Sequence, residues 1–336
     1  MSDPPFVISP VDASNAEAVP PVFRSLYGDS FPMEYVYHGD HILAEIEAGR
    51  LHAALARDAD GMPVGYIALY TNTPNPRLWE AGNLLVVPGR GSGDLAWSLM
   101  QHYLRPENRP AAGSDGIFGE AVCHHYFTQL GCAKSGFVDC ALMLDQMNGA
   151  AFKEHAPETE RVACLLQFFE QSDPTGISYL PQQYFELLQG LLKPLRPRTL
   201  LPGTAPLPGA GEVQRQDKWF EGAGMWRVAV STIGADWDLF LDDLLARARQ
   251  RQVTSLQVVL SAGLPCISAA VERMRQRGFF LGGVLPRWFG ADGVMMQQVL
   301  GKEPDFEGVK LYGVVAKSLL TFIRNDRETV LSESKG

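Results

Sequence analysis

Residues 84–100 combine an apolar run, a glycine-rich turn and the start of an amphipathic helix. The turn carries one arginine, Arg90, and places glycines at alternate positions, Gly89, Gly91 and Gly93. A turn that leads a strand into a helix N-terminus gathers free backbone N–H groups beside the positive end of the helix dipole, which suits a phosphate or pyrophosphate. Glycines let ligand oxygens approach the backbone because no Cβ is in the way. The stretch therefore predicts an anion site, with an ordinary glycine-rich turn as the alternative.

The spacing of this turn is that of neither common nucleotide-binding loop, because no Lys-Ser/Thr pair follows the glycines and their order is not the Rossmann order. It resembles the pyrophosphate loop of the GCN5-related N-acetyltransferases (the GNAT superfamily), in which Val-x-Pro and then Arg-Gly-x-Gly-x-Gly/Ala open the helix that holds coenzyme A. The matching residues are Val86, Pro88, Arg90, Gly91, Gly93 and Ala96. One residue is missing between Pro88 and Arg90, and Leu95 stands where the family has a small residue.

The resemblance implies acetyl-CoA or coenzyme A as a cosubstrate, and no metal. The pantetheine arm of the coenzyme would pair with free backbone groups of the strand before the loop, as an added strand does. An amine on a small molecule or a peptide is the implied acyl acceptor. No nucleic-acid or membrane partner is expected, and an oligomer is possible. The residues implied in coenzyme binding are Leu85, Val86, Val87, Arg90, Gly91, Ser92, Gly93, Asp94 and Ala96.

Acyl transfer to an amine needs a base that removes a proton from the ammonium group and an acid for the leaving thiolate. Glu80, on the strand that leads into the loop, occupies the sort of position where the family often keeps its base, and Glu120 on the next strand is a second candidate. Either could instead be an exposed strand carboxylate. The family's usual acid is a tyrosine four residues before the glycine of a Gly-Phe pair, and the position that matches here, before Gly136, holds Cys132. Tyr126, earlier on the same helix, is the alternative proton donor.

Two adjacent histidines, His124 and His125, follow the strand that contains Glu120. Histidine suits proton transfer near neutral pH, although surface or capping roles explain this pair equally well. No third ligand at a suitable spacing accompanies them, so they do not predict a metal site.

Hydrophobic periodicity and turn residues predict the elements that would position these groups. The order matches the GNAT fold, a mixed central sheet flanked by helices, so the resemblance covers roughly residues 6–147. Asp58-Ala59-Asp60-Gly61 is a hairpin signal between two of the strands. The expected strands are 6–8, 51–57, 64–70, 79–87, 117–123 and 137–146, and the expected helices are 22–27, 41–48, one from the loop to about 104, and 126–135.

The C-terminal part repeats half of this plan and resembles the second half of another GNAT module, with chance similarity of a simple α/β pattern as the alternative. Here the turn at the phosphate position, residues 233–237, has no arginine and carries Asp236. An anion is not expected beside that acid, so the second module would be structural or would shape the substrate site. The expected strands are 227–233, 256–260, 281–285 and 294–300, and the expected helices are 236–250 and 267–277, the latter again ending in Gly-Phe.

These patterns predict an α/β (α+β) chain of two GNAT-type modules. The expected domains are an N-terminal GNAT-like domain at 1–149, a connecting strand-helix segment with a Pro/Gly-rich linker at 150–212, and a reduced C-terminal GNAT-like domain at 213–336. Within the linker, residues 194–211 are expected to be flexible because they are dense in proline and glycine. A helix is expected at 311–322, followed by a polar end at 324–336 that frays.

Bulk properties narrow the class of protein. A chain of 336 residues is long enough for two domains, and its 46% hydrophobic and 20% charged residues are typical of a globular protein. The net charge of −9 argues against a broad nucleic-acid surface, and no apolar run reaches the length of a membrane span. Five scattered cysteines and an N-terminus without secretion features predict reduced thiols in the cytoplasm.

The leading hypothesis is an acyl-CoA-dependent N-acyltransferase, with acetyl as the expected acyl group and an amine of unknown identity as acceptor. The alternative is a catalytically inactive GNAT-fold protein that binds acyl-CoA and acts in regulation or interaction. The missing tyrosine and the shortened loop favour this alternative. A scaffold without any ligand is a third hypothesis, which requires Leu95 to close the loop.

Overall fold

The computed structural model divides the chain into two compact units, Met1–Gly119 and Glu120–Gly336, called here the first and the second unit. The boundary falls within one strand, β5 (Gly116–Val122). The predicted domain limits at 149/150 and 212/213 follow a repeat in the order of elements and stay a prediction. The structure describes residues 6–29, 31, 33–90, 93–110, 113–149 and 161–333.

The first unit contains a sheet with the strand order β1-β2-β3-β4-β5. The first three pairings are antiparallel and the last, between β4 and β5, is parallel. The predicted hairpin turn joins β2 to β3, and Asp58 holds it by accepting hydrogen bonds from the N–H groups of Asp60 and Met62. The strands before β5 are β1 (Phe6–Pro10), β2 (Leu51–Asp58), β3 (Pro63–Tyr70) and β4 (Leu78–Val86).

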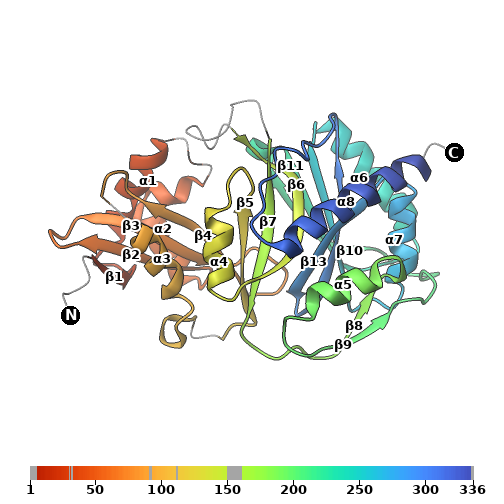
Figure 1. Cartoon of the computed structure of the whole chain (residues 1–336), viewed down its shortest axis with the longest axis horizontal. Coiled ribbons are helices and arrows are strands. Elements are labelled where there is room, and N and C mark those ends of the chain that lie inside the picture. The colour runs from red at the N-terminus through yellow and green to blue at the C-terminus, as the bar shows by residue number, and fades with distance from the viewer. Residues whose placement is uncertain are drawn as a thin grey trace. The chain divides into compact units, whose positions relative to one another are not determined.

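Helices cover both faces of this sheet (Figure 1). On one face, Phe23 of α1 and Ile42 of α2 are buried in one cluster with Tyr66 of β3. On the other face, Leu95 and Leu99 of α3 pack on Gly65, where a Cβ would lie 2.9 Å from the Leu99 methyl group. The elements are α1 (Val19–Tyr27), α2 (Gly39–Glu47) and α3 (Gly93–His102), with the short 3-10 helices η1 (Ala16–Ala18), η2 (Glu34–Tyr37) and η3 (Pro106–Asn108).

The second unit has a larger mixed sheet with the order β7-β6-β13-β14-β12-β11-β10, and a separate parallel pair, β8 with β9. The strands and helices predicted for the C-terminal part are confirmed in their order along the chain. The strands are β6 (Val138–Asn148), β7 (Arg161–Glu170), β8 (Ile177–Leu180), β9 (Thr199–Pro202), β10 (Gln214–Phe220), β11 (Met225–Thr232), β12 (Ser255–Ser261), β13 (Phe280–Phe289) and β14 (Ala291–Val299).

Helices of the second unit lie against this sheet, and Figure 1 shows α8 crossing the strands β6 and β13. No helix in the described ranges is both long and apolar enough to cross a membrane. The helices are α4 (Phe127–Lys134), α5 (Phe185–Leu192), α6 (Trp237–Gln250), α7 (Ile267–Arg275) and α8 (Val314–Glu333), with the 3-10 helices η5 (Gln182–Tyr184) and η6 (Glu221–Ala223).

Two helix–hairpin pieces of the second unit share one construction. After α4 the chain turns at Gly136 (φ 84°), and after α7 it turns at Gly278 (φ 87°). Both glycines adopt the left-handed conformation that ends helices, and the next residue closes the turn by donating back to the helix, Phe137 N to Cys132 O at 3.0 Å and Phe279 N to Met274 O at 3.1 Å. Each piece then continues into an antiparallel hairpin, β6–β7 or β13–β14.

The two hairpins meet at β6 and β13 through one backbone bridge, Gly283 opposite Ala141. Gly283 has φ 137°, and a Cβ there would lie 2.5 Å from the Cys140 carbonyl oxygen, so only glycine allows this approach. The buried Gln297 side chain adds two hydrogen bonds to β6: its Nε2 donates to Leu142 O, and its Oε1 accepts from Leu144 N, both at 2.9 Å. A side-chain amide thus takes the place of part of a strand ladder.

Two sequence expectations on the second unit are wrong. Residues 324–333 continue α8 instead of fraying, because Asp326 and Val330 are buried and Asp326 accepts from Leu281 N at 2.8 Å. The expected flexible stretch 194–211 contains β9, and Arg198 within it forms ion pairs with the buried carboxylates of Glu170 and Asp292 at 2.6 and 3.1 Å. Both segments depend on distant partners that a local reading does not show.

Candidate functional site

The parallel pair β4–β5 opens soon after it begins. Pairing covers three positions, from Leu78 opposite Gly116 to Glu80 opposite Phe118, and β4 then continues to Val86 without a partner on that side, both strands lying wholly in the described part of the chain. The side chains of 81–84 are only half-buried, in contrast to the buried start of the strand. An unpaired strand edge offers N–H and C=O groups to an extended ligand. Leu85 and Val86, both expected to bind the coenzyme, lie on this stretch.

A β-bulge in β4 accompanies the opening. The register with β3 shifts between Ala68 opposite Gly82 and Tyr66 opposite Leu85, and Asn83 between them has φ 53°. A non-glycine residue in this conformation marks a strained or re-aimed backbone. The Asn83 Nδ2 atom is buried and has no hydrogen-bond partner among the described residues. The bulge therefore leaves a buried donor beside the open edge.

The turn after β4 is held mostly by its own backbone. Val87 N donates to Val64 O at 2.9 Å, and Arg90 N donates to Val87 O at 3.1 Å around Gly89, which has φ 74°. The exposed Arg90 guanidinium lies 3.3 Å from the Asp58 carboxylate. The hydrogen bonds from Met62, Asp60 and Arg90, that from Met62 first, hold the pKa of Asp58 below its usual value. Arg90 thus faces an acid of the β2–β3 turn in this structure.

Of the remaining residues expected to bind a coenzyme, Gly91 and Ser92 lie outside the described residues. Gly93 is the first residue of α3, Asp94 is exposed in its first turn, and Ala96 is half-buried. Leu95 is buried against Gly65, so its side chain belongs to the core of the first unit.

Glu80 has a well-formed polar environment within the first unit. Its side chain is buried (8% exposed), and it accepts a hydrogen bond from the Tyr70 hydroxyl at 2.7 Å and another from the Asn72 amide. Two donors on its two oxygens fix the orientation of the carboxylate. Tyr70 and Asn72 were missed in the sequence, where the only signal is that Tyr70 closes one strand and Glu80 opens the next.

Glu120 lies in the second unit and is engaged in a buried ion pair. Arg227 Nη1 lies 2.8 Å from its Oε1, and the Gln146 amide donates to its other oxygen. Arg227 is only 5% exposed; it also donates to Gln257 Oε1 at 2.7 Å, and its guanidinium lies 5.4 Å from the centre of the Trp288 ring. Since a buried charge requires its partner, this arrangement indicates an anchoring role. The catalytic role of Glu120 stays a prediction, and the mechanism proposed below gives it no part.

The two candidate acids also lie in the second unit. Tyr126 precedes α4 and is 47% exposed, whereas Cys132 within α4 is buried. Burial first, and the negative charge of Asp139 second, raise the pKa of the Cys132 thiol to about 12. The rings of His124 and His125 pack edge to face, 4.3 Å apart. All five cysteines are free and buried, and no group of three or more His, Cys, Asp or Glu residues that could hold a metal occurs among the described residues.

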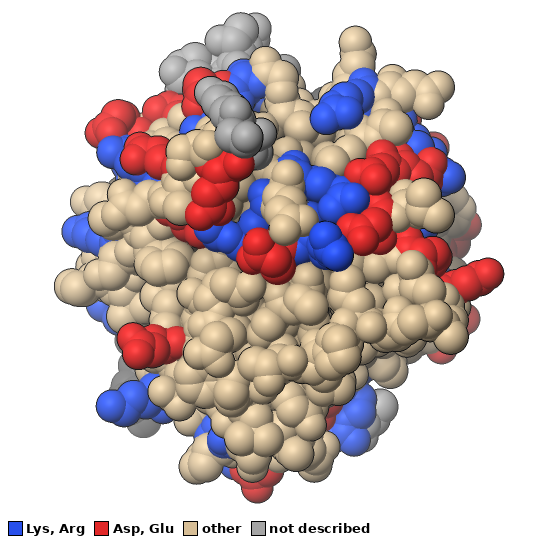
Figure 2. All heavy atoms as spheres, turned by 90° about the vertical axis from the view of Figure 1, so that its right-hand side faces the viewer, with Lys and Arg blue, Asp and Glu red and all other residues tan. Residues whose placement is uncertain are grey.

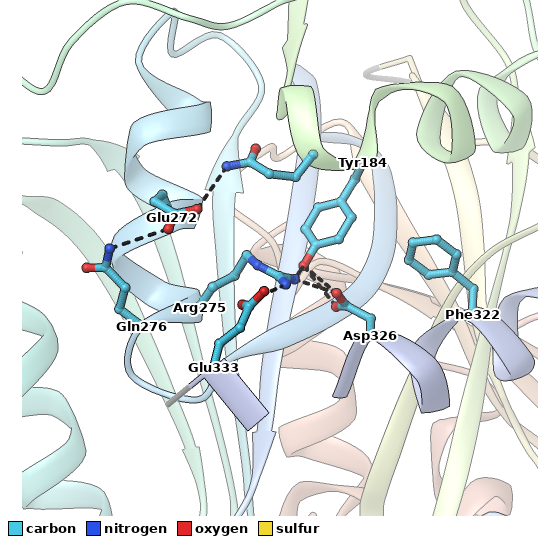
Figure 3. Close-up of a pocket in the computed structure, with 8 residues that line it drawn as sticks. Tyr184, Glu272, Arg275, Gln276, Phe322, Asp326 and Glu333 are labelled. Atoms are coloured by element: carbon cyan, nitrogen blue, oxygen red, sulfur yellow. Dashed lines mark hydrogen bonds and ion pairs between the residues drawn. The ribbon is translucent and has the colours of Figure 1, made fainter. Parts of the chain in front are cut away.

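A cleft of about 630 Å³ in the second unit lies between α7, α8 and η5 (Figure 3). In its floor the Arg275 guanidinium contacts both Tyr184 and Asp326, Tyr184 donates to Asp326 at 2.8 Å, and Glu333 lies 3.2 Å from Arg275 on the other side. Burial is the main cause of the raised pKa of Tyr184, which therefore stays a neutral donor. These groups satisfy one another and fasten α8 to α7, and none of the predicted site residues lines the cleft.

Charged side chains of the second unit are largely paired on its surface. Between α6 and α7, Arg277 lies 2.7 Å from Asp242 and 3.0 Å from Asp238. Figure 2 shows the same intermixing on one face, where basic and acidic side chains adjoin and a broad neighbouring area carries few charges.

The order of elements decides the fold. The first strand, two helices, three strands, helix, strand, helix and strand follow one another as the sequence predicted, and the fourth and fifth strands pair in parallel. The chain has a GNAT-type fold. The mixed sheet flanked by helices, with a second set of such elements after it, agrees with the predicted α/β class.

No protein-family model matches the chain, and no curated protein matches it. Among solved structures it is similar to a Desulfovibrio desulfuricans protein described as a GNAT-family acetyltransferase, with 17% identity over 49% of this chain and 98% of that chain and a TM-score of 0.36. It is also similar to the spermidine N-acetyltransferase of Vibrio cholerae, with 11% identity over 50% of this chain and 95% of that chain and a TM-score of 0.40. Arabidopsis thaliana NAA60 is similar with 12% identity over 49% of this chain and 97% of that chain and a TM-score of 0.37. Likenesses this low bear on neither substrate nor activity.

Proposed function

We propose that the chain is an acyl-CoA-dependent N-acyltransferase, with acetyl as the acyl group, that acts on an amine with Glu80 as the base. The observation that carries the proposal is the opening of β4 away from β5 directly after the buried, doubly hydrogen-bonded Glu80. An open strand edge and a carboxylate at the point of opening are what a thioester arm and an ammonium group require.

The coenzyme would lie along 85–87 and reach the start of α3 with its phosphates. Helix N-termini stabilise phosphates through free N–H groups and the helix dipole. Arg90 would exchange Asp58 for a phosphate at small cost, because an exposed ion pair contributes about 0–1 kcal/mol. The unpartnered Asn83 amide supplies a further donor beside the open edge. Gly91, Ser92, Gly93, Asp94 and Ala96 complete the proposed binding segment.

The bound thioester supplies an activated acyl carbon. Glu80 takes one proton from the ammonium group of the acceptor, and the freed nitrogen lone pair attacks the carbonyl carbon. The carbon–sulfur bond then breaks, the nitrogen loses a second proton as the amide forms, and the sulfur takes one up to become a thiol. Glu80 returns its proton to solvent, so each turnover releases one proton.

A second candidate is a regulatory protein that binds acyl-CoA without turnover. It is favoured by the burial of Cys132 at the position of the family's acid, which leaves no exposed donor there. The second set of elements and the free thiols support two further proposals, a tandem arrangement and a reducing, cytoplasmic compartment.

Calorimetry and a thiol-release assay test the proposal. We expect the protein to bind acetyl-CoA and coenzyme A, and to release thiol with at least one member of a panel of polyamines, aminoglycosides and peptides. Glu80→Gln should keep the coenzyme affinity and lower kcat by about 10²–10⁴-fold, the range for loss of a general base. Binding without turnover would favour the regulatory protein. Absence of binding at millimolar coenzyme would refute both.

A further inference from the structure

Tyr70 stands directly opposite Glu80 in the antiparallel pair of β3 and β4. Directly opposite residues of a ladder share a face, so the two side chains meet without crossing the sheet. The hydroxyl of Tyr70 is 2.7 Å from Glu80 Oε1, and Asn72 holds the other oxygen. Tyr70 is also packed against the aromatic core under α1 and α2, which fixes its ring.

Gly82, two residues beyond Glu80 on the same face of β4, leaves the space that the Tyr70 ring uses. A Cβ at Gly82 would lie 2.6 Å from the Tyr70 hydroxyl oxygen and 2.9 Å from its Cε1 atom. Real Cβ atoms do not approach other atoms so closely, so even alanine would push the ring aside. The backbone of Gly82 is not in the left-handed conformation, so this glycine is required for space and not for its conformational freedom.

We propose that Tyr70 is a positioning residue of the transfer site. We further propose that Gly82, which has no side chain, leaves the space that the Tyr70 ring needs to reach Glu80. The Tyr70 hydroxyl, lying over Gly82, holds the Glu80 carboxylate in the orientation in which it receives the proton of the acceptor. This inference rests on the proposed N-acyltransferase function and adds two residues to it. Since the hydroxyl proton is engaged with Glu80, Tyr70 acts through Glu80 and not on the coenzyme.

The chain offers a matched control for Tyr70. Tyr66 lies four residues earlier on β3 and on the same face, and its buried hydroxyl has no hydrogen-bond partner among the described residues. Removing an unsatisfied hydroxyl is neutral or stabilising. Tyr66→Phe and Tyr70→Phe therefore make the same chemical change on one strand, and only the second removes a contact with Glu80.

The experiment measures kcat, KM for the amine, coenzyme affinity by calorimetry, and the thermal midpoint for the wild type and the variants. We expect Tyr70→Phe and Gly82→Ala to lower kcat by about 10–100-fold with coenzyme affinity unchanged, and Tyr66→Phe to keep kcat. Tyr70→Phe retains the ring and serves as the milder variant if Gly82→Ala lowers the thermal midpoint.

A double variant separates positioning from a merely structural role. If Tyr70 acts only through Glu80, Glu80→Gln with Tyr70→Phe should be no slower than Glu80→Gln alone, because residues that act as a unit are not additive. The inference is overturned if Tyr70→Phe keeps the kcat of Tyr66→Phe, or if the losses in the double variant multiply. If the wild type itself released no thiol with any amine of the panel, the proposed N-acyltransferase function would be overturned instead.

Discussion

Two parallel strand pairs, β4–β5 in the first unit and β11–β12 in the second, begin alike and then diverge. In each pair the second paired residue is a tryptophan and the third is charged, Trp79-Glu80 in β4 and Trp226-Arg227 in β11. The pair β4–β5 separates after three positions, whereas β11–β12 continues over six, from Met225 to Val230. Every residue of β12 is buried. One order of elements therefore yields an open edge in the first unit and a closed one in the second.

The charged residue at the start of each pair differs accordingly. Glu80 accepts hydrogen bonds from two neutral donors, Tyr70 and Asn72. Arg227 is neutralised by Glu120 and bonded to Gln257. A buried ion pair indicates a structural role, because removing either partner leaves an uncompensated buried charge. The opening of the strands, more than the order of elements, therefore distinguishes the candidate site of the first unit from the closed pair of the second.

The largest expected effect tests that contrast through stability. Arg227→Met should lower the free energy of unfolding by about 3–5 kcal/mol, because Glu120 is left buried without its partner. Glu80→Gln should cost less, about 1–3 kcal/mol, because one of its two donors keeps an oxygen acceptor and only the other is left facing an NH2 group. Denaturant titration followed by tryptophan fluorescence measures both. Adding Glu120→Gln to Arg227→Met should recover most of the loss, and equal losses for Arg227→Met and Glu80→Gln would remove the contrast.

A smaller effect concerns the turn after β4. Arg90→Ala should weaken coenzyme binding about tenfold, close to 1.4 kcal/mol, because a charge-assisted contact to phosphate is lost. Arg247→Ala is the matched control: Arg247 is similarly exposed (49% against 51%) and pairs with Asp243 on α6. Calorimetry should show no change for the control. An unchanged affinity for Arg90→Ala would place the phosphates elsewhere.

Two histidines of the first unit, His52 and His102, should make the protein less stable as the pH falls. Burial lowers the pKa of His52 below its usual 6.5, and burial together with the charge of Arg105 lowers that of His102. A lowered pKa means that the unfolded chain binds protons more readily, so their contribution is complete above pH 6.5 and is lost as pH falls below it. His52→Gln should reduce this loss, by a fraction of a kcal/mol for a half-buried ring, in denaturation midpoints between pH 7 and 5. Midpoints with the same slope in variant and wild type would contradict it.

The smallest expected effect compares the acids at two helix starts. Asp94→Asn at the start of α3 should raise coenzyme affinity by about two- to threefold at low salt, because a charge that repels phosphate is removed. Asp236→Asn before α6 should create no coenzyme binding, since Asp236 Oδ1 accepts from Val213 N at 2.9 Å and no open edge precedes that helix. Calorimetry in the double variant Arg90→Ala with Asp236→Asn isolates any second site.

Local signals in the sequence predicted the elements well. The Gly-Phe pairs after α4 and α7 marked both helix ends, because glycine is the residue that accepts the left-handed turn. The Asp58–Gly61 turn marked its hairpin for a similar reason. Strand and helix positions followed from periodicity, and with them the GNAT-type order.

Long-range partners could not be predicted. Glu120 and Arg227 are 107 positions apart, and nothing local to either indicates that they meet. The contact of Tyr70 with Glu80 required the register across a proline-containing loop, which its sequence does not specify. The ordered end of α8 depends in the same way on Arg275 and Tyr184. Composition alone therefore suggested a frayed end where tertiary contacts continue the helix.

The meeting of β6 and β13 has a mechanical consequence. One backbone bridge at Gly283 and one side chain, Gln297, join strands that elsewhere are held by full ladders. If the sheet of the second unit were pulled apart, the line between β6 and β13 would have the fewest backbone hydrogen bonds to break. The helix α8 packs on both strands and so holds them together across this line. The helix α8 thus adds contacts across the line where the backbone pairing of this sheet is thinnest.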